Sequence, residues 1–260
     1  MNIANSSTML PYQLEGCGHP LLLIHGWGVT YAVWRKLVPL LAPHFQLILV
    51  ELPGTGAMSD VVFDKPYYPT CAEALEELRV ALGIEQWSIL AYSTGTRVGE
   101  VYVQQYPQRV SHAVFLCPIY LRRSINILHR ILQRIDAKRS SVISWLLSDW
   151  RLYGLLLLLG FNLRRHDPID DWMSEIKLLP TENLKRVLAE LPGNGRAPFL
   201  LPTSPSVPAL FVWGVRDVLT APPSQLRPND AIILACHGAP VLNPEDVAEV
   251  VLPFLKEGAS

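Results

Sequence analysis

Charge imbalance, cysteine pairs and long hydrophobic segments are all missing from this sequence. Its 260 residues include 22 lysines and arginines against 23 aspartates and glutamates, so no electrostatic attraction to nucleic acid is predicted. The cysteines are few and far apart, without a C-x-x-C pair: Cys17, Cys71, Cys117 and Cys236. This spacing argues against a disulfide framework and against a zinc site, and it indicates reduced thiols in a cytoplasmic protein.

The longest uncharged hydrophobic run covers 152–163, well below the roughly 20 residues that a helix needs to span a bilayer. Residues 1–11 show no basic segment followed by a hydrophobic core, so no signal peptide is predicted. Internal repeats and low-complexity segments are also missing. We therefore expect a cytoplasmic protein with no integral membrane segment.

Half of the residues are hydrophobic, which is enough for a large core, and they follow two patterns. Continuous or alternating hydrophobic runs, typical of strands, lie at 9–15, 21–24, 45–50, 87–91, 110–116, 208–213 and 231–235. Helical spacing is found at 33–41, 70–82, 96–106 and 244–256. Strands joined by helices predict an α/β fold with a mostly parallel central sheet flanked by helices.

The stretch 119–206 interrupts this alternation, because it shows helical patterns and no strand pattern. Strand and helix patterns resume after a proline-rich segment that ends near residue 208. The sequence therefore predicts a core domain formed by 1–118 and 207–260, with a helical insertion at 119–206.

A serine stands where a predicted strand meets a predicted helix. The run 87–91 leads into Tyr92-Ser93-Thr94-Gly95, and a strand, sharp turn and helix would raise the Ser93 hydroxyl above the sheet edge. Such a turn strains the serine backbone and needs small neighbours, which Ala91 and Gly95 provide. This is the G-x-S-x-G nucleophile elbow with alanine in the first glycine position. The alternative is a serine that only caps the helix.

Two further polar residues, Asp217 and His237, each follow a predicted strand. In parallel sheets, reactive groups gather beyond the carboxyl ends of the strands. A serine nucleophile needs a base in hydrogen-bond contact, and the base needs an orienting acid. We assign Ser93 as nucleophile, His237 as general base and then acid, and Asp217 as its partner. Taken singly, His237 could be a turn histidine and Asp217 a loop carboxylate that accepts backbone N–H bonds.

An oxyanion intermediate would need two N–H donors. The residue after the nucleophile, Thr94, supplies one, and the loop His25-Gly26-Trp27-Gly28 supplies the other through the Trp27 N–H. The predicted substrate pocket contains His25, Gly26, Tyr92 and, from the insertion, Trp145; His25 is expected to be structural rather than a second base. Since these groups suffice for acyl transfer, neither a metal nor an organic cofactor is predicted.

Five motifs together resemble the α/β-hydrolase superfamily: those at 22–28, 52–56, 92–95, 213–217 and 237–240. The resemblance implies an α/β-hydrolase fold with a helical cap over the active site. His25-Gly26-Trp27-Gly28 with the following Val33-Trp34-Arg35 is similar to methyl-ester esterases that act on pimeloyl-carrier protein in biotin synthesis. The elbow instead resembles the lyase of menaquinone synthesis, which uses the same triad for elimination. Three positions depart from the family pattern: Ala91, Thr96 and Gly238.

The predicted cap is hydrophobic enough to line an apolar substrate tunnel, although most of these residues must also attach the cap to the core. They include Ile125, Ile131, Trp145, Leu146, 155–159 and Phe161. A basic stretch in the same region could dock an acidic acyl carrier protein or an anionic membrane surface. A solvated helix face is the simpler interpretation and the one that we favour. The stretch contains Arg122, Arg123, Arg130, Arg134, Lys138 and Arg139.

The sequence thus predicts a serine hydrolase that cleaves a carboxylic ester of a small to medium apolar acyl group, or a methyl ester, through an acyl-enzyme. One alternative is a cofactor-free lyase or C–C bond hydrolase on the same triad. Another is a ligand-binding protein of this fold without catalysis.

Overall fold

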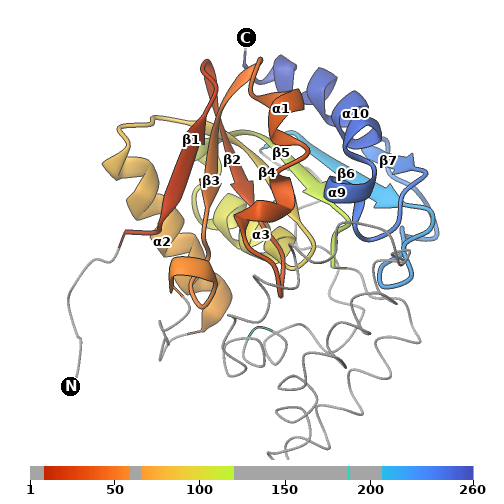
Figure 1. Ribbon diagram of the computed structural model, residues 1–260, viewed down its shortest axis with the longest axis horizontal. Helices are drawn as coiled ribbons and strands as arrows, with labels where there is room; N and C mark the ends of the chain where they lie inside the picture. The colour runs from red at the N-terminus through yellow and green to blue at the C-terminus, as the bar shows by residue number, and fades with distance from the viewer. Residues whose placement is uncertain (1–8, 59–65, 120–186, 188–206, 260) are drawn as a thin grey trace, which may run out of the picture.

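The computed structural model describes residues 9–58, 66–119, 187 and 207–259. In this part of the chain, one sheet of seven strands has the order β1-β3-β2-β4-β5-β6-β7 (Figure 1). The β1 strand runs antiparallel to β3, and every other neighbouring pair is parallel. The strands are β1 Tyr12–Glu15, β2 His19–Ile24, β3 Phe45–Val50, β4 Trp87–Tyr92, β5 Val110–Leu116, β6 Ala209–Gly214 and β7 Asp230–Ile233.

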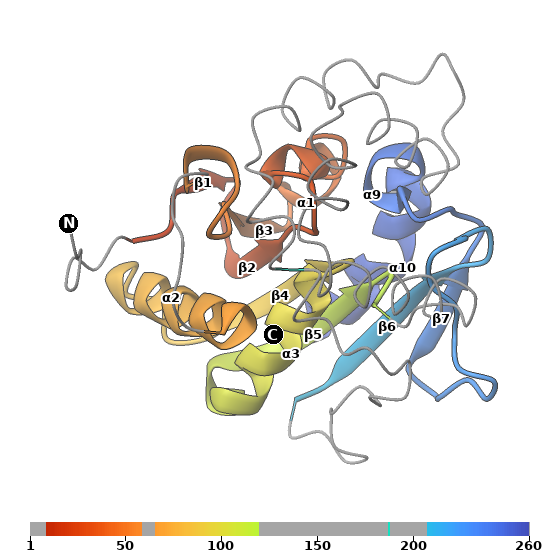
Figure 2. The same cartoon turned by 90° about the horizontal axis from the view of Figure 1, so that it is seen from below.

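Helices cover both faces of this sheet (Figure 2). One face carries α2 (Tyr67–Ala81) and α3 (Gly95–Gln105), and the other carries α1 (Val38–Leu41), α9 (Ala239–Leu242) and α10 (Pro244–Glu257). Short 3₁₀ turns lie at η1 Tyr31–Trp34, η2 Gly56–Met58 and η3 Pro107–Arg109. The predicted mostly parallel sheet flanked by helices is therefore confirmed. Within the described ranges, no helix combines the length and hydropathy that crossing a bilayer requires.

The predicted helix at 33–41 is wrong. The structure has η1 followed by the separate short helix α1. Thr30 caps η1 by accepting the Ala32 N–H at 3.3 Å. Pro39 lies in the first turn of α1, where proline is tolerated, whereas inside a continuous helix it would remove a hydrogen bond and its ring would crowd the carbonyl one turn earlier.

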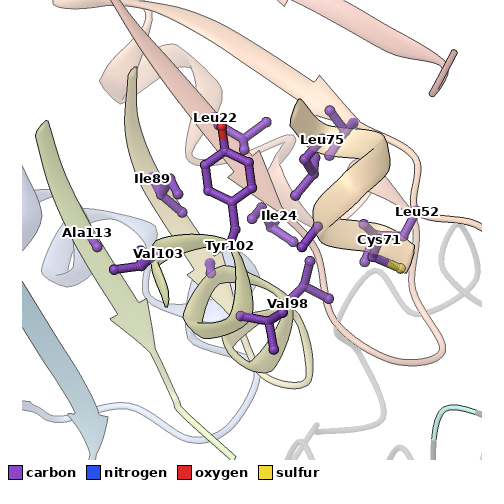
Figure 3. Packing of buried hydrophobic residues seen from close by; sticks show 14 of the residues in the cluster. Leu22, Ile24, Leu52, Cys71, Leu75, Ile89, Val98, Tyr102, Val103 and Ala113 are labelled. Atoms are coloured by element: carbon purple, nitrogen blue, oxygen red, sulfur yellow. The ribbon is translucent and has the colours of Figure 1, made fainter. Parts of the chain in front are cut away.

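Two hydrophobic clusters hold the layers together, one on each face of the sheet. On the α2–α3 face, Val98 and Tyr102 of α3 lie over Ile24 of β2 and Ile89 of β4, while Leu75 of α2 approaches from the side (Figure 3). All of these side chains are fully buried, and each contributes about 2 kcal/mol to folding. The cluster fixes the position of α3, and with it the position of the residues at the amino end of that helix.

One carboxylate on α3 is buried with incomplete hydrogen bonding. Glu100 is 2% exposed, its Oε2 accepts a bond from Arg97 at 2.8 Å, and its Oε1 has no hydrogen-bond partner among the residues that the structure describes. Burial raises the pKa of Glu100 to about 7, and this effect exceeds the opposing effect of Arg97. The charged form is therefore costly in the folded protein.

Replacing Glu100 with glutamine should change stability in a pH-dependent way. A carboxyl whose folded pKa is raised stabilises the fold below its ordinary value of 4.5 and loses that contribution as the pH rises through about 7. Relative to wild type, the free energy of unfolding of Glu100→Gln should therefore rise by about 3 kcal/mol between pH 4.5 and pH 8. Denaturant unfolding at several pH values measures this difference.

A matched control is Glu76→Gln on α2. Burial raises the pKa of Glu76, but hydrogen bonds from Arg79 and Tyr102 outweigh it, so the pKa is lowered overall. Its contribution is present above the ordinary pKa and is lost as the pH falls, so this variant should lose stability relative to wild type as the pH rises. The same pH trend in both variants would contradict the explanation given for Glu100.

Candidate active site

The nucleophile elbow lies between β4 and α3. Ser93 has a φ of 53°, in the left-handed region, where a residue with a side chain carries strain of about 1–3 kcal/mol. Its N–H donates to the Leu116 carbonyl at 3.0 Å, so the end of β5 holds the turn in place. The strained turn predicted at this serine is present.

Residues without side chains surround the elbow. A Cβ added at Gly26 would lie 2.8 Å from the Cβ of Ser93, and one added at Gly95 would overlap the backbone oxygen of His25. Any side chain at either position would push the serine or the neighbouring loop out of place. These two glycines therefore allow the loop after β2 to approach the nucleophile.

Ala91, the residue in the first glycine position of the motif, packs against α3. Ala91 is fully buried, and a Cβ added at Gly99 of α3 would lie only 3.2 Å from its methyl group. The missing side chain at 99 therefore leaves space for the extra methyl at 91. This packing agrees with the expectation that alanine fits at position 91.

The structure brings Ser93, His237 and Asp217 together from three strand ends. The Ser93 Oγ lies 2.8 Å from His237 Nε2, and His237 Nδ1 lies 2.8 Å from Asp217 Oδ2. All three residues are at most 7% exposed. Hydrogen bonds of this length form a continuous path for a proton from the serine hydroxyl to the imidazole.

The surroundings of Asp217 keep it ionised. Its Oδ1 accepts the N–H groups of Leu219 and Thr220, and its Oδ2 accepts the Thr220 hydroxyl at 2.7 Å. Burial raises the pKa of Asp217, but the interactions with His237 and Thr220 lower it by more. The pKa of Asp217 therefore lies below its ordinary value. Because a carboxylate can only accept, the hydrogen of the neutral imidazole sits on Nδ1, and Nε2 is left to accept the proton of Ser93.

Two residues predicted to line the pocket are placed elsewhere. His25 is fully buried; its Nδ1 donates to the Gly26 carbonyl at 2.9 Å and its Nε2 accepts the Leu52 N–H at 3.1 Å. Burial lowers the pKa of His25 to about 4, so it is a neutral link between two loops. This arrangement agrees with the structural role expected for its side chain.

Tyr92 is 1% exposed, and its hydroxyl donates to the His237 carbonyl at 2.8 Å. Its ring also lies against the imidazole, with the centroids 5.5 Å apart. Tyr92 therefore holds the histidine in place, and it is not among the described lining residues of the pocket next to the elbow. Trp145, the remaining predicted pocket residue, lies outside the described residues.

A pocket adjoins the elbow. Both residues predicted to donate to an oxyanion, Trp27 and Thr94, line it, as does Gly26. Thr94 is the N-cap of α3, so the positive end of the helix dipole is also at the site. Its other described lining residues are Gly28, Leu52, Pro53, Gly54, Thr55, Tyr67, Val98 and Val187.

A cysteine that sequence reasoning passed over lies beside the acid. Cys117 follows β5 with a φ of 46°, and its sulfur is within 4.8 Å of ligand atoms of Asp217 and His237. The Asp217 carboxylate and the His237 imidazole are already hydrogen-bonded to each other. Burial raises the pKa of the Cys117 thiol. A buried protonated thiol beside an occupied pair is a poor set of ligands for a metal ion. The only signal in the sequence was that Cys117 directly follows a strand.

Comparison with known proteins agrees with this architecture. A family model described as alpha/beta hydrolase fold matches residues 19–147. A solved hydrolase from Pseudomonas aeruginosa superposes with a TM-score of 0.76 at 21% identity, over 95% of this chain and 94% of that one. This chain has the α/β-hydrolase fold. An inhibitor-bound epoxide hydrolase from Bacillus megaterium also superposes, with a TM-score of 0.77 at 17% identity, over 97% of this chain and 99% of that one.

Because α/β-hydrolases catalyse different reactions, these distant structures show the fold alone. A curated relative from Photobacterium profundum, named pimeloyl-[acyl-carrier protein] methyl ester esterase, is 35% identical over 112 residues. That match covers 42% of this chain and 40% of the relative. Since this chain matches only two fifths of the relative's length, the relative's activity does not transfer to it directly.

Proposed function

We propose that this protein is a serine hydrolase that cleaves carboxylic esters through an acyl-enzyme. The observation that carries the proposal is the continuous hydrogen-bonded series from Ser93 through His237 to Asp217, with both distances at 2.8 Å. A hydroxyl that shares its proton with an oriented neutral imidazole is an activated nucleophile.

The proposed reaction has two halves. The Ser93 proton moves to His237 Nε2 while Oγ attacks the ester carbonyl carbon, and the backbone N–H groups of Trp27 and Thr94 stabilise the resulting oxyanion. The intermediate collapses, the alcohol leaves with the proton from His237, and the acyl group stays on Ser93. Water then gives a proton to His237 and attacks the acyl carbon. The second intermediate collapses as the bond from the acyl carbon to Ser93 Oγ breaks, the proton on His237 returns to Oγ, and the acid is released. No step needs a metal or an organic cofactor.

The pocket favours an uncharged acyl group. Its described lining contains no charged side chain, and its polar side chains are those of Thr55, Tyr67 and Thr94. Since curated relatives are named pimeloyl-[acyl-carrier protein] methyl ester esterases, a methyl ester on an acyl chain held by a carrier protein is the proposed substrate type. Docking of that carrier on the basic stretch of the predicted cap 119–206, and a cytoplasmic location, belong to the same proposal.

A panel of acyl esters tests the function. With p-nitrophenyl esters of increasing acyl length, we expect a burst of nitrophenol equal to the enzyme concentration, followed by slower turnover, because the activated leaving group makes acylation faster than deacylation. Uncharged short and medium chains should be cleaved faster than esters whose acyl chain ends in a carboxylate. A fluorophosphonate probe should label Ser93, as peptide mass spectrometry would show.

Absence of both the burst and the labelling would contradict the proposal. Labelling without ester turnover, together with elimination or C–C cleavage of a suitable substrate, would support the lyase alternative. Ligand binding with no labelling and no turnover would support a binding protein of this fold.

A further inference from the structure

The threonine that departs from the family pattern makes two hydrogen bonds beside the nucleophile. Thr96 is fully buried in the first turn of α3. Its hydroxyl donates to the Ser93 carbonyl at 2.5 Å and accepts the Ile119 N–H at 3.3 Å. The Thr96 backbone N–H also donates to the Ser93 carbonyl, at 3.0 Å. The Thr96 hydroxyl therefore acts as both donor and acceptor, and both of these hydrogen bonds are made within the protein.

These bonds join two strained turns. Among the described residues, Ser93 and Cys117 are the two non-glycine residues with positive φ, and they follow the neighbouring strands β4 and β5. The Ser93 N–H donates a hydrogen bond to the Leu116 carbonyl, and the Cys117 N–H donates one to the Val212 carbonyl. Thr96 adds a connection from the carbonyl of the first turn to Ile119, two residues beyond the second.

The connection restricts how the Ser93 peptide can rotate. The φ of Ser93 is held by its N–H bond to β5, and its carbonyl is held by two donors from Thr96. With both ends of the residue fixed, its Oγ has little freedom relative to His237 Nε2. A glycine at 96, as in the family pattern, would leave the carbonyl with the backbone donor alone and would leave the Ile119 N–H without this acceptor.

We infer that Thr96 is a positioning residue for Ser93, and that the Thr96 hydroxyl holds the nucleophile's turn against the turn at Cys117, which directly precedes the predicted insertion 119–206. The inference rests on the proposed function, because it concerns the reactivity of Ser93. It assigns Thr96 no contact with substrate. Its effect passes through the orientation of the serine, which matters most in the step where Oγ attacks.

Two substitutions at one position separate the hydroxyl from the packing. Thr96→Val keeps the shape and removes both hydrogen bonds, whereas Thr96→Ser keeps the hydroxyl and removes only a methyl group. We expect Thr96→Val to lower kcat and the rate of fluorophosphonate labelling about tenfold, with KM within about twofold of wild type. We expect Thr96→Ser to stay within about twofold of wild type in both.

The matched control is Thr70→Val, because the Thr70 hydroxyl makes the same kind of first-turn bond, to the Pro66 carbonyl at 2.7 Å, in α2. It should lose stability to a similar extent, while its labelling rate, measured well below the unfolding temperature, stays within about twofold of wild type. Equal slowing in Thr70→Val and Thr96→Val would overturn the inference, as would equal slowing in Thr96→Ser and Thr96→Val.

The outcomes also separate this inference from the proposed function. A labelled wild type with an unaffected Thr96→Val overturns the role of Thr96 and leaves the function standing. A wild type that turns over no ester and is not labelled overturns the proposed function, and the positioning role falls with it.

Discussion

Replacing Ser93 with alanine is expected to lower kcat/KM for an ester substrate by at least about 10⁴-fold. The Ser93 Oγ is the atom that would carry the acyl group, and it lies 2.8 Å from the base. Alanine cannot form the covalent intermediate, so only the oxyanion donors and substrate binding remain. The measurement is steady-state hydrolysis of a p-nitrophenyl ester, with loss of the burst and of fluorophosphonate labelling.

The matched control for this variant is Ser88→Ala, on the same strand. Ser88 is also fully buried and lies near a histidine, with its Oγ 3.2 Å from His19 Nε2 and 2.8 Å from Ser111 Oγ. It lies at the other end of β4, away from the elbow and outside the described lining of the pocket. Its loss should affect stability and leave the burst intact. Equal loss of activity in both variants would show that the assay reports folding rather than a nucleophile at 93.

Replacing Asp217 with asparagine is expected to lower kcat/KM by about 10⁴-fold with the fold retained. Asparagine can still accept the N–H groups of Leu219 and Thr220, but its amide group would donate to His237 Nδ1. The imidazole would then carry its hydrogen on Nε2, where it could not accept the proton of Ser93. The loss should appear in kcat, because the tautomer matters to the chemical step and not to binding.

Asp230→Asn is the control for the acid. Like Asp217, Asp230 has a carboxylate that accepts a ring N–H, from Trp213 Nε1 at 3.0 Å, and it also accepts Arg227 at 2.8 Å. It lies at the start of β7, at the opposite end from His237. Its loss should reduce stability and leave kcat within about twofold of wild type. An Asp217→Asn variant with the activity of Asp230→Asn would contradict the assignment of Asp217.

Much of the fold could be predicted because each strand is marked by its own local pattern. The runs at 45–50 and 110–116 coincide with β3 and β5, and the other strands differ from their predictions at one or both ends. The prediction of one helix at 33–41 was wrong. It used the helical spacing of the hydrophobic residues and ignored the effect of Pro39 on the neighbouring backbone. The short helix α9, directly after His237, gave no periodic signal because it is only four residues long.

The order of the predicted triad was also readable from the sequence, but the distances within it were not. Ser93 and His237 are 144 positions apart, and they meet because the parallel strands end at one level. The register pairs Tyr92 with Leu116 and Gly214 with Ile233. A local pattern can show that a residue follows a strand, but it cannot show which strands are neighbours or how they are aligned.

The sequence by itself determined the strands, the small residues around the serine, and the polar residues that follow three strand ends. These features depend on hydrophobicity, backbone freedom and spacing within a few positions. Only the tertiary structure decided that His25 is a buried neutral link, that Gly99 makes room for Ala91, and that the Thr96 hydroxyl reaches Ile119. Each of these depends on contacts between segments far apart in the chain, which form only when the helices settle on the sheet.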